Sequence, residues 1–244
     1  MIEITNTMVE GFEPAIRGMR NSWNSWDKSD SGKASIYDEC DGCDICVYGG
    51  GNRNTECFRY LNGYCIEAYF IGEDDLALMK KLIKAGTDHR KFLRMITVWC
   101  DITAPRMWFL EFDTYKVGTV SNSCSTMHTI LEMPFDDNDF DLEPDAFSTE
   151  LVDHLNFIRD RVIELNDVGN TDEAKKLWRH LINLLPQSYH QKRTVMLNYE
   201  VLMNMYNARK NHRLDEWKEF CKWVEELPYM KELLEALNDS NYRN

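Results

Sequence analysis

The sequence predicts an α/β (α+β) protein in which helices flank a central sheet and the C-terminal half is largely helical. Residues 95–103 alternate apolar with polar positions, the period of two that indicates a half-buried strand. Several later segments place apolar residues at helical spacing. The chain has 244 residues, of which 43% are hydrophobic, so it can bury a core sufficient for one large domain or two small ones.

One helix is expected ahead of this strand. Residues 21–72 show no persistent period and include a Cys- and Gly-rich run, so an irregular segment is expected there. Asp74 or Asp75 can then cap a helix over residues 76–83. Gly86 is placed to end that helix in the left-handed conformation.

A second helix is predicted directly after the strand at residues 95–103. Ala104-Pro105 indicates its start, since a proline in the first helical turn removes no backbone donor that the helix needs. The helix is expected to run to about Tyr115.

Four helices are predicted after an acidic, Pro-containing connector at residues 136–145. Apolar residues at helical spacing occupy 147–165 and 172–185 around an Asp-Val-Gly-Asn turn, and then 195–209 and 214–227. The apolar stripe of the last segment is most simply part of the core.

The charge balance argues against two classes of partner. With 28 basic and 41 acidic residues the formal net charge is −13, which repels phosphate backbones and anionic bilayers. Duplex nucleic acid and membranes are therefore not expected as partners. The sequence shows neither the pattern of an export signal nor a stretch of about 18 apolar residues, so a cytoplasmic location is expected.

Five of the eight cysteines lie together in the irregular segment, which is interpreted as an insertion at about residues 28–72. These candidate metal ligands are Cys40, Cys43, Cys46, Cys57 and Cys65. Four thiolates at such short spacings can bind zinc tetrahedrally, and the metal would order a polar loop. The spacing matches neither a paired zinc knuckle nor the bacterial iron–sulfur run, so reduced, unliganded thiols are the other interpretation.

Two groups of residues follow one another in an order found in a known family. The first is a His, a strand, Ala-Pro, a helix and a polar loop, represented by His89, 95–103, Ala104-Pro105 and 114–127. The second is Leu185-Pro186 followed by the run from Asn198 to Arg209. Together they resemble the flavin-dependent thymidylate synthase (ThyX) family over less than a third of the chain. The resemblance implies a ThyX-like fold in a single domain over residues 1–244.

The loop at residues 114–127 departs from the family's signature, Arg-His-Arg-x-x-Ser-x-Asn-Glu-x-Ser-x-Arg-Tyr. Only Lys116 for an Arg and Thr119 for a Ser keep similar chemistry. An arginine fork binds a phosphate bidentately, which Thr114 or Thr126 cannot do. The loop therefore offers hydrogen-bond donors with fewer positive charges than the family pattern.

The resemblance also implies roles for individual positions. The residues implied for cofactor binding are His89, Tyr115, Lys116, Asn122, Asn198 and Asn204. The residues implied for substrate binding are Thr114, Thr119, Ser121, Thr126 and Arg209. Because 11 residues are close to three helical turns, Asn198 and Arg209 are expected on one helix face, where Glu200 replaces a family Arg.

Two further positions are candidate catalytic residues. Cys124 stands at a family Ser that assists base activation, and its thiol is a nucleophile only if its pKa is lowered. Otherwise a small buried residue is expected. Glu111 stands at a family Gln that contacts the nucleotide, where its carboxylate can accept from a base amino group or pair with Lys116 or Arg106 on the helix surface.

The activity that the resemblance implies is reductive methylation of a pyrimidine deoxynucleotide, dUMP or an analogue, in dTMP biosynthesis. FAD would be the cofactor, folate the carbon donor and NADPH the hydride donor, at a site formed in a homotetramer or another homo-oligomer. Two alternatives stay open. One is a non-catalytic nucleotide-binding or regulatory oligomer on the same scaffold. The other is a zinc-stapled interaction module built around Trp23, Trp26 and the cysteines.

Overall fold

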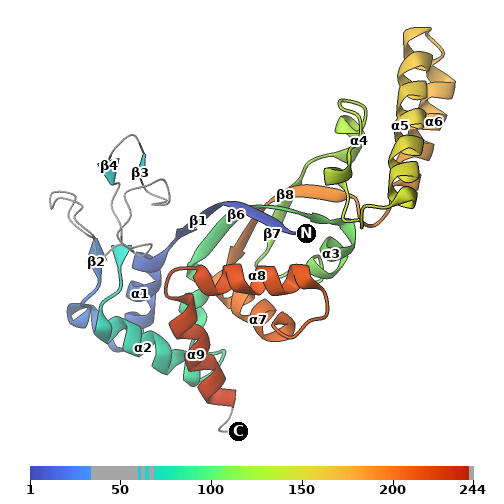
Figure 1. Ribbon diagram of the computed structural model, residues 1–244. Coiled ribbons are helices and arrows are strands. Elements are labelled where there is room, and N and C mark those ends of the chain that lie inside the picture. The colour runs from blue at the N-terminus through green and yellow to red at the C-terminus, as the bar shows by residue number, and fades with distance from the viewer. Residues whose placement is uncertain (34–59, 62–63, 66–68, 242–244) are drawn as a thin grey trace. The chain divides into compact units, whose positions relative to one another are not determined.

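The fold is built on one antiparallel four-stranded sheet (Figure 1). The computed structural model describes residues 1–33, 60–61, 64–65 and 69–241. In their order across the sheet the strands are β1 (Glu3–Glu10), β6 (Thr97–Pro105), β8 (His190–Asn198) and β7 (Val120–Ser123). The sheet and its helices confirm the predicted mixed α/β class with a helical C-terminal half.

Strand β6 follows the predicted alternation. Val98, Cys100, Ile102 and Ala104 are buried with exposed fractions of at most 1%, and the residues between them are half-buried. Burial of alternate side chains is what a period of two produces, because successive residues point to opposite faces of a sheet. The strand extends to Pro105, beyond the predicted end, and the helix after it is shorter than predicted.

Contacts within the chain define two compact units. Unit 1 comprises Met1–Ile4, Asp101–Tyr115 and Ser121–Val195. Unit 2 comprises Thr5–Cys100, Lys116–Val120 and Met196–Asn244.

Unit 1 carries a long helical hairpin (Figure 1). Its helical elements are α3 (Arg106–Phe112), α4 (Thr126–Thr129), η4 (Asp137–Asp139), α5 (Ala146–Asp167) and α6 (Thr171–Leu184). Helices α5 and α6 bury Leu155, Ile158 and Leu181 in one apolar cluster. Asp145 caps α5 through a reciprocal pair of bonds with Ser148, as expected for an acidic residue at a helix start.

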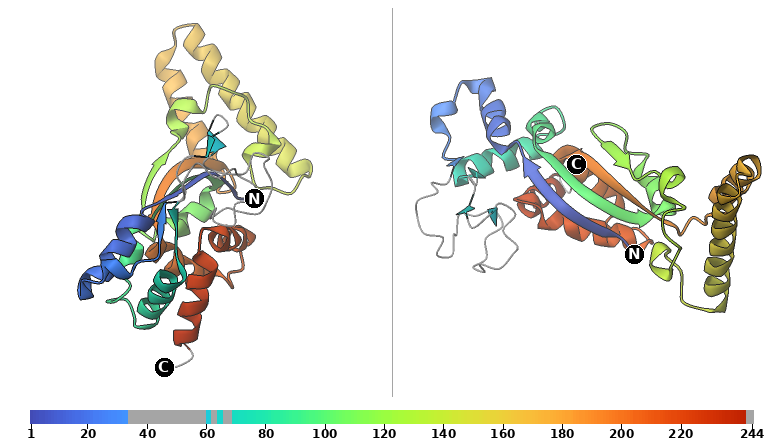
Figure 2. Two further views of the ribbon diagram at one scale, coloured as in Figure 1. Left: turned by 90° about the vertical axis from the view of Figure 1, so that its left-hand side faces the viewer. Right: turned by 90° about the horizontal axis from the view of Figure 1, so that it is seen from above.

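Unit 2 packs helices from both ends of the chain together. Its helical elements are α1 (Phe12–Arg20), η1 (Asn21–Trp23), η2 (Trp26–Lys28), α2 (Glu73–Lys84), η3 (Lys91–Met95), α7 (Tyr199–Arg209), α8 (Asp215–Glu226) and α9 (Met230–Asn241). Helices α2 and α9 lie side by side (Figure 2). The buried Tyr199 ring meets Phe12 edge-to-face at 5.7 Å, and its hydroxyl donates to the carbonyl of Pro228 at 2.7 Å.

Short strand pairs complete unit 2. Strand β2 (Gly32–Lys33) pairs antiparallel with β5 (Tyr69–Phe70), and β3 (Tyr60–Leu61) pairs antiparallel with β4 (Tyr64–Cys65). In the described part of the chain, no helix combines the length and hydropathy that a membrane crossing requires.

Two predicted helix starts are wrong for physical reasons. Residues 195–198 belong to β8, because they pair within the sheet, and α7 begins only after Asn198. Helix α2 is capped by neither Asp74 nor Asp75; the carboxylate of Asp30, distant in sequence, accepts from the backbone N–H groups at its start.

Candidate functional site

A pocket in unit 2 contains His89, the first of the predicted cofactor-binding residues. The pocket has a volume of about 1150 Å³. Its walls come from the end of α1 with η1 and η2, from α2, and from η3. Trp23, which is 86% exposed, and Phe92 give it aromatic surface. The volume is at the upper end of the roughly 300–1,000 Å³ that is usual for small-molecule sites.

The lining of this pocket, called the His89 pocket here, carries more positive than negative charge. Lys28 on η2, Lys81 on α2 and Lys91 on η3 line it, together with the carboxylates Asp74 and Asp88. A cleft with one dominant sign of charge concentrates ligands of the opposite sign. The pocket therefore suits an anionic ligand with an aromatic part.

His89 is held by the turn that ends α2. Gly86 has a φ of 105°, and its carbonyl accepts from the N–H of His89 at 3.0 Å. The prediction that Gly86 ends the helix in the left-handed region is confirmed. Glycine is favoured there because a Cβ disfavours positive φ.

Asn198 lies at the start of α7 as its N-cap. Its side-chain oxygen accepts from the N–H of Val201 at 3.0 Å. Gly118 packs directly on it: an added Cβ at this positive-φ glycine would lie 2.6 Å from the Asn198 amide nitrogen. The turn at residues 116–120 thus places the backbone of Gly118 against the first turn of α7.

Asn204 is exposed at the edge of a buried ion pair within unit 2. The guanidinium of Arg90 donates to one carboxylate oxygen of Glu200, from Nε at 3.2 Å and from Nη2 at 3.0 Å, and to Asn204 Oδ1 at 3.4 Å. Arg90 and Glu200 are 6% and 7% exposed. Glu200 therefore occupies the family's Arg position with the opposite charge and neutralises the cation that comes from the segment before η3.

Arg209 packs against Trp217 at the end of α7. Its guanidinium lies over the ring of Trp217, 4.8 Å from the centroid, as a cation–π pair. Asn198 and Arg209 stand at opposite ends of α7, about 16 Å apart at 1.5 Å of rise per residue. That both contact one ligand stays a prediction.

Three predicted residues of unit 1 stand at the end of α3. Glu111 is half-buried, and its carbonyl accepts from the hydroxyl of Thr114 at 2.7 Å. Tyr115 is half-buried just beyond it. The hydroxyl of Thr114 is thus engaged in ending the helix, as is common for this residue type.

The remaining predicted residues of unit 1 lie along and after β7. Ser121 and Asn122 are exposed on this strand, and Thr126 begins α4. Cys124 is exposed, with its sulfur 3.9 Å from the Thr129 hydroxyl, so the expectation of a small buried residue is wrong. The backbone of Cys124 continues the sheet pairing, since its N–H donates to the carbonyl of Lys192 at 2.8 Å.

The basic side chains near this loop in unit 1 are already engaged. Arg193 on β8 lies over the Phe109 ring at 3.9 Å and pairs with Asp113 at 2.6 Å. Lys192 lies 3.8 Å from Asp101. Arg193 and Lys192 were not predicted from the sequence. They come close to the segment from β6 to α3 only because β8 pairs with β6 in the sheet.

The architecture has close structural counterparts. The crystal structure of thymidylate synthase X (ThyX) from Helicobacter pylori with FAD and dUMP matches with a TM-score of 0.58 and 17% sequence identity, over 97% of this chain and 99% of that chain. A second H. pylori structure, of flavin-dependent thymidylate synthase ThyX complexed with FAD and dUMP, matches at the same TM-score and identity over 98% and 99%. The fold is that of ThyX.

Comparison of sequences detects less similarity than comparison of structures. No protein-family model matches the chain, and neither does any curated protein. At 17% identity the ThyX fold is retained while the side chains have diverged. Glu200, which the resemblance places at a family Arg, is one such difference, and it pairs with Arg90.

The predicted metal ligands fall largely outside the described residues. Cys40, Cys43, Cys46 and Cys57 lie outside them, and Cys65 is described only by its backbone in β4. Within the described residues no cluster of three or more His, Cys, Asp or Glu side chains is arranged to hold a metal ion.

Proposed function

We propose that the protein binds FAD in the His89 pocket and acts as a flavin-dependent enzyme on a pyrimidine nucleotide. The observation that carries the proposal is the combination of this pocket with a fold that matches FAD-bound ThyX along nearly the whole chain. Size and chemistry fit a dinucleotide: the pocket holds about 1150 Å³ and offers Trp23 for stacking. Lys28, Lys81 and Lys91 would meet the charge of its diphosphate.

The implied reaction is reductive methylation of dUMP or an analogue with folate and NADPH, in the cytoplasm and in a homotetramer. Bound FAD would supply the hydride chemistry. The chain's own part would be to hold the ligands: the turn with Lys116 and Thr119 presents polar groups beside Asn198. Glu111 and Cys124 remain the proposed catalytic residues, and Tyr115, Ser121 and Asn122 the proposed contacts along the loop.

A second candidate function is a non-catalytic, nucleotide-binding oligomer, and the ion pairs of the described residues favour it. Arg90 is neutralised by Glu200, Arg193 by Asp113, and Arg209 is stacked on Trp217. A guanidinium that already has a carboxylate partner binds a phosphate less well, because the ligand must displace that partner. Such a protein would take up FAD without turning over dUMP.

The first test is titration of the purified protein with FAD, followed by absorbance between about 300 and 550 nm and by Trp fluorescence. Binding should quench Trp23, which lines the pocket. His89→Ala and Lys91→Gln should weaken binding, whereas Lys176→Gln on the exposed face of α6 should not. Absence of any uptake at 100 μM FAD, taken as about the weakest useful affinity, would exclude the flavin proposal.

The second test separates the enzyme from the binding protein. Protein loaded with FAD is mixed with dUMP, methylenetetrahydrofolate and NADPH, and NADPH oxidation and thymidylate are measured. Turnover that is lost in Cys124→Ala or Glu111→Ala supports the enzyme. Tight FAD binding with no turnover supports the non-catalytic function. Light scattering of the same sample tests the proposed tetramer.

Zinc binding at the cysteine cluster stays a separate proposal. Metal analysis of protein purified without chelator should find about one zinc per chain, since four thiolates complete a tetrahedral site. A zinc content near zero under these conditions would leave the cysteines as free thiols.

A further inference from the structure

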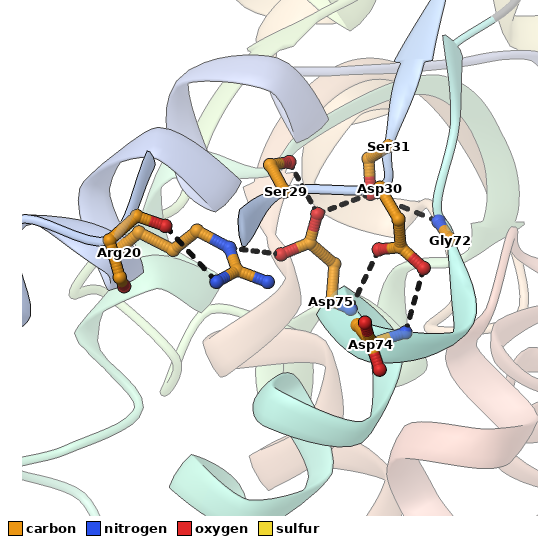
Figure 3. A network of polar contacts seen from close by, with 8 residues as sticks. Arg20, Ser29, Asp30, Ser31, Gly72, Asp74 and Asp75 are labelled. Carbon is orange, nitrogen blue, oxygen red and sulfur yellow. Dashed lines mark hydrogen bonds and ion pairs between the residues drawn. The ribbon is translucent and has the colours of Figure 1, made fainter. Parts of the chain in front are cut away.

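A buried polar network in unit 2 joins the two ends of the proposed insertion to the start of α2 (Figure 3). The carboxylate of Asp75 is fully buried and accepts from Arg20 Nε at 2.6 Å, from the Ser29 hydroxyl at 2.6 Å and from the Ser31 hydroxyl at 2.7 Å. The carboxylate of Asp30 accepts from two backbone N–H groups of α2, those of Asp74 at 2.9 Å and Asp75 at 3.0 Å. This network is called the Asp75 clasp.

The Asp75 clasp joins two of the segments that form the walls of the His89 pocket. Arg20, Ser25 and Lys28 line the pocket from the segment after α1, and Asp74 and Lys81 line it from α2. Arg20 reaches both sides, since its Nη1 donates to the carbonyl of Ser25 at 3.2 Å while its Nε holds Asp75. Asp75, Ser29 and Ser31 do not line the pocket. They can therefore affect a bound ligand only by changing the position of the residues that form the walls.

Apolar packing does not hold the first of these walls. Helical turns η1 and η2, which carry Trp23 and Lys28, bury no side chain. A surface segment without buried side chains is free to move unless polar contacts fix it. Among the described residues, this segment is fixed by the hydrogen bond from Trp26 Nε1 to Asn21 Oδ1 at 2.8 Å, by the bond from Arg20 Nη1 to the Ser25 carbonyl at 3.2 Å, by short turn bonds and by the clasp.

The backbone at Gly72 permits the clasp to close. A Cβ added there would lie 2.1 Å from the Asp30 side chain, which caps α2, and the N–H of Gly72 donates to the Ser31 hydroxyl at 3.0 Å. Glycine at this position is required by close approach, not by backbone conformation.

We infer that Asp75, with Ser29 and Ser31, positions the Trp23–Lys28 wall of the His89 pocket and so sets its affinity for a dinucleotide without touching it. The inference rests on the proposed function for its ligand, but the placement of the wall can be measured without any ligand. Loss of the two serine hydroxyls removes three hydrogen bonds, two to Asp75 and one from the N–H of Gly72, and leaves the buried charge pair of Asp75 with Arg20 in place. The wall should then loosen while the core stays folded.

The experiment compares Ser29→Ala/Ser31→Ala with Ser29→Thr/Ser31→Thr, which keeps both hydroxyls. Asp75→Asn is a stronger second variant, matched by Asp215→Asn in an exposed ion pair on α8. Hydrogen exchange of the flavin-free protein should be faster by about tenfold at the amides of Ser25, Lys28 and Ser29 in the alanine variant, because the three hydrogen bonds of the serine hydroxyls are lost. The threonine variant and Asp215→Asn should match wild type.

FAD titration of the same proteins then reports on affinity. The dissociation constant should rise by about tenfold in the alanine variant, from the loss of the same three bonds, and recover with threonine. Unchanged amide exchange would overturn the inference whether or not FAD binds. Faster exchange with unchanged FAD affinity would also overturn it and leave FAD binding intact. Failure of wild type to bind FAD, with faster exchange in the variant, would reject the FAD proposal and the affinity claim but keep the placement of the wall.

Discussion

The Arg90–Glu200 pair shows that two opposite charges can be buried together inside this protein. Arg90 and Glu200 form a pair at 3.0 Å in which both side chains are almost fully buried. Removing one charge of a buried ion pair destabilises the folded protein more than replacing both residues by apolar ones, because the remaining ion has lost both its water and its partner.

Replacing Glu200 by Gln is therefore expected to lower the free energy of unfolding by about 3 kcal/mol. Glu219→Gln, in the exposed pair with Lys222 on α8, should cost clearly less, because water screens this pair. Urea denaturation followed by circular dichroism measures both. Equal, small losses in the two variants would show that the Arg90 pair is not desolvated as described.

The pH dependence of stability should report on Asp75. Burial by itself raises the pKa of this carboxyl, but hydrogen bonds from Ser29, Ser31 and Arg20 outweigh it, so the pKa is lowered from its ordinary value of 3.8. A folded-state pKa below the unfolded one gives stability that is complete above the unfolded pKa and is lost as pH falls through the folded pKa.

The loss of stability in acid should therefore be less steep below about pH 4 in Asp75→Asn than in wild type. The variant should also be less stable at pH 7, where the wild-type carboxylate is charged and paired with Arg20. Urea unfolding at several pH values between about 3 and 7 measures this. Parallel curves for the two proteins would contradict the role given to Asp75.

Among the elements, two glycines with nearly the same backbone conformation offer a matched comparison. Gly118 and Gly169 have φ values of 78° and 77°. A Cβ at Gly118 would meet the side chains of Asn198 and Val201 at 2.6 and 3.0 Å, whereas a Cβ at Gly169 would have open space.

Gly169→Ala should cost about 1 kcal/mol, the backbone term alone. Gly118→Ala should cost clearly more, because the turn at Lys116–Val120 must also move away from the start of α7. The difference in urea midpoint between the two variants measures the crowding. If both variants lose the same stability, the turn does not pack on Asn198.

The elements also show which parts of the fold the sequence could predict. Strand β6 was predictable because its own alternation matches its own burial. Strand β7 was not, because all four of its residues are exposed and only its pairing with β8 makes it a strand. The run at 195–198 has apolar spacing that a helix would also show, and the sheet decides its conformation.

The site was predictable in part for the same reason. His89 and Asn198 were selected from the family resemblance, and only the helix end at Gly86, just before His89, follows from a local signal. Lys28, Lys81 and Lys91 have no common signal, because their segments meet only in the folded unit 2. The neutralisation of Arg90 by Glu200 joins residues 110 positions apart, and no periodicity reports such a pairing.

At the scale of the whole molecule, residues 28–72 are proposed to be an insertion whose ends meet. In the β2–β5 pair Lys33 lies opposite Tyr69 and Gly32 opposite Phe70. Two antiparallel strands in this register can be joined by a two-residue Asn-Gly turn.

Replacing residues 34–68 by Asn-Gly should therefore give a folded protein at least as stable as wild type, because the entropic cost of closing a connection falls by about 0.6 kcal/mol for each halving of its length, or roughly 2.5 kcal/mol here. FAD affinity should be kept, because the described residues that line the His89 pocket are retained. Thermal unfolding and the FAD titration check both. Loss of cooperative unfolding would mean that the excised segment is part of the core of unit 2.

The Arg90–Glu200 pair predicts how these two positions vary among related proteins. A lineage cannot replace one member of a buried ion pair without passing through a form that carries a lone buried charge. Relatives of this chain that keep its fold should therefore change the two positions together, either to the reverse pair or to two apolar residues. A chain with a cation at position 200 should lack one at position 90, and this joint inheritance would distinguish the branch that this protein represents from other ThyX-fold proteins.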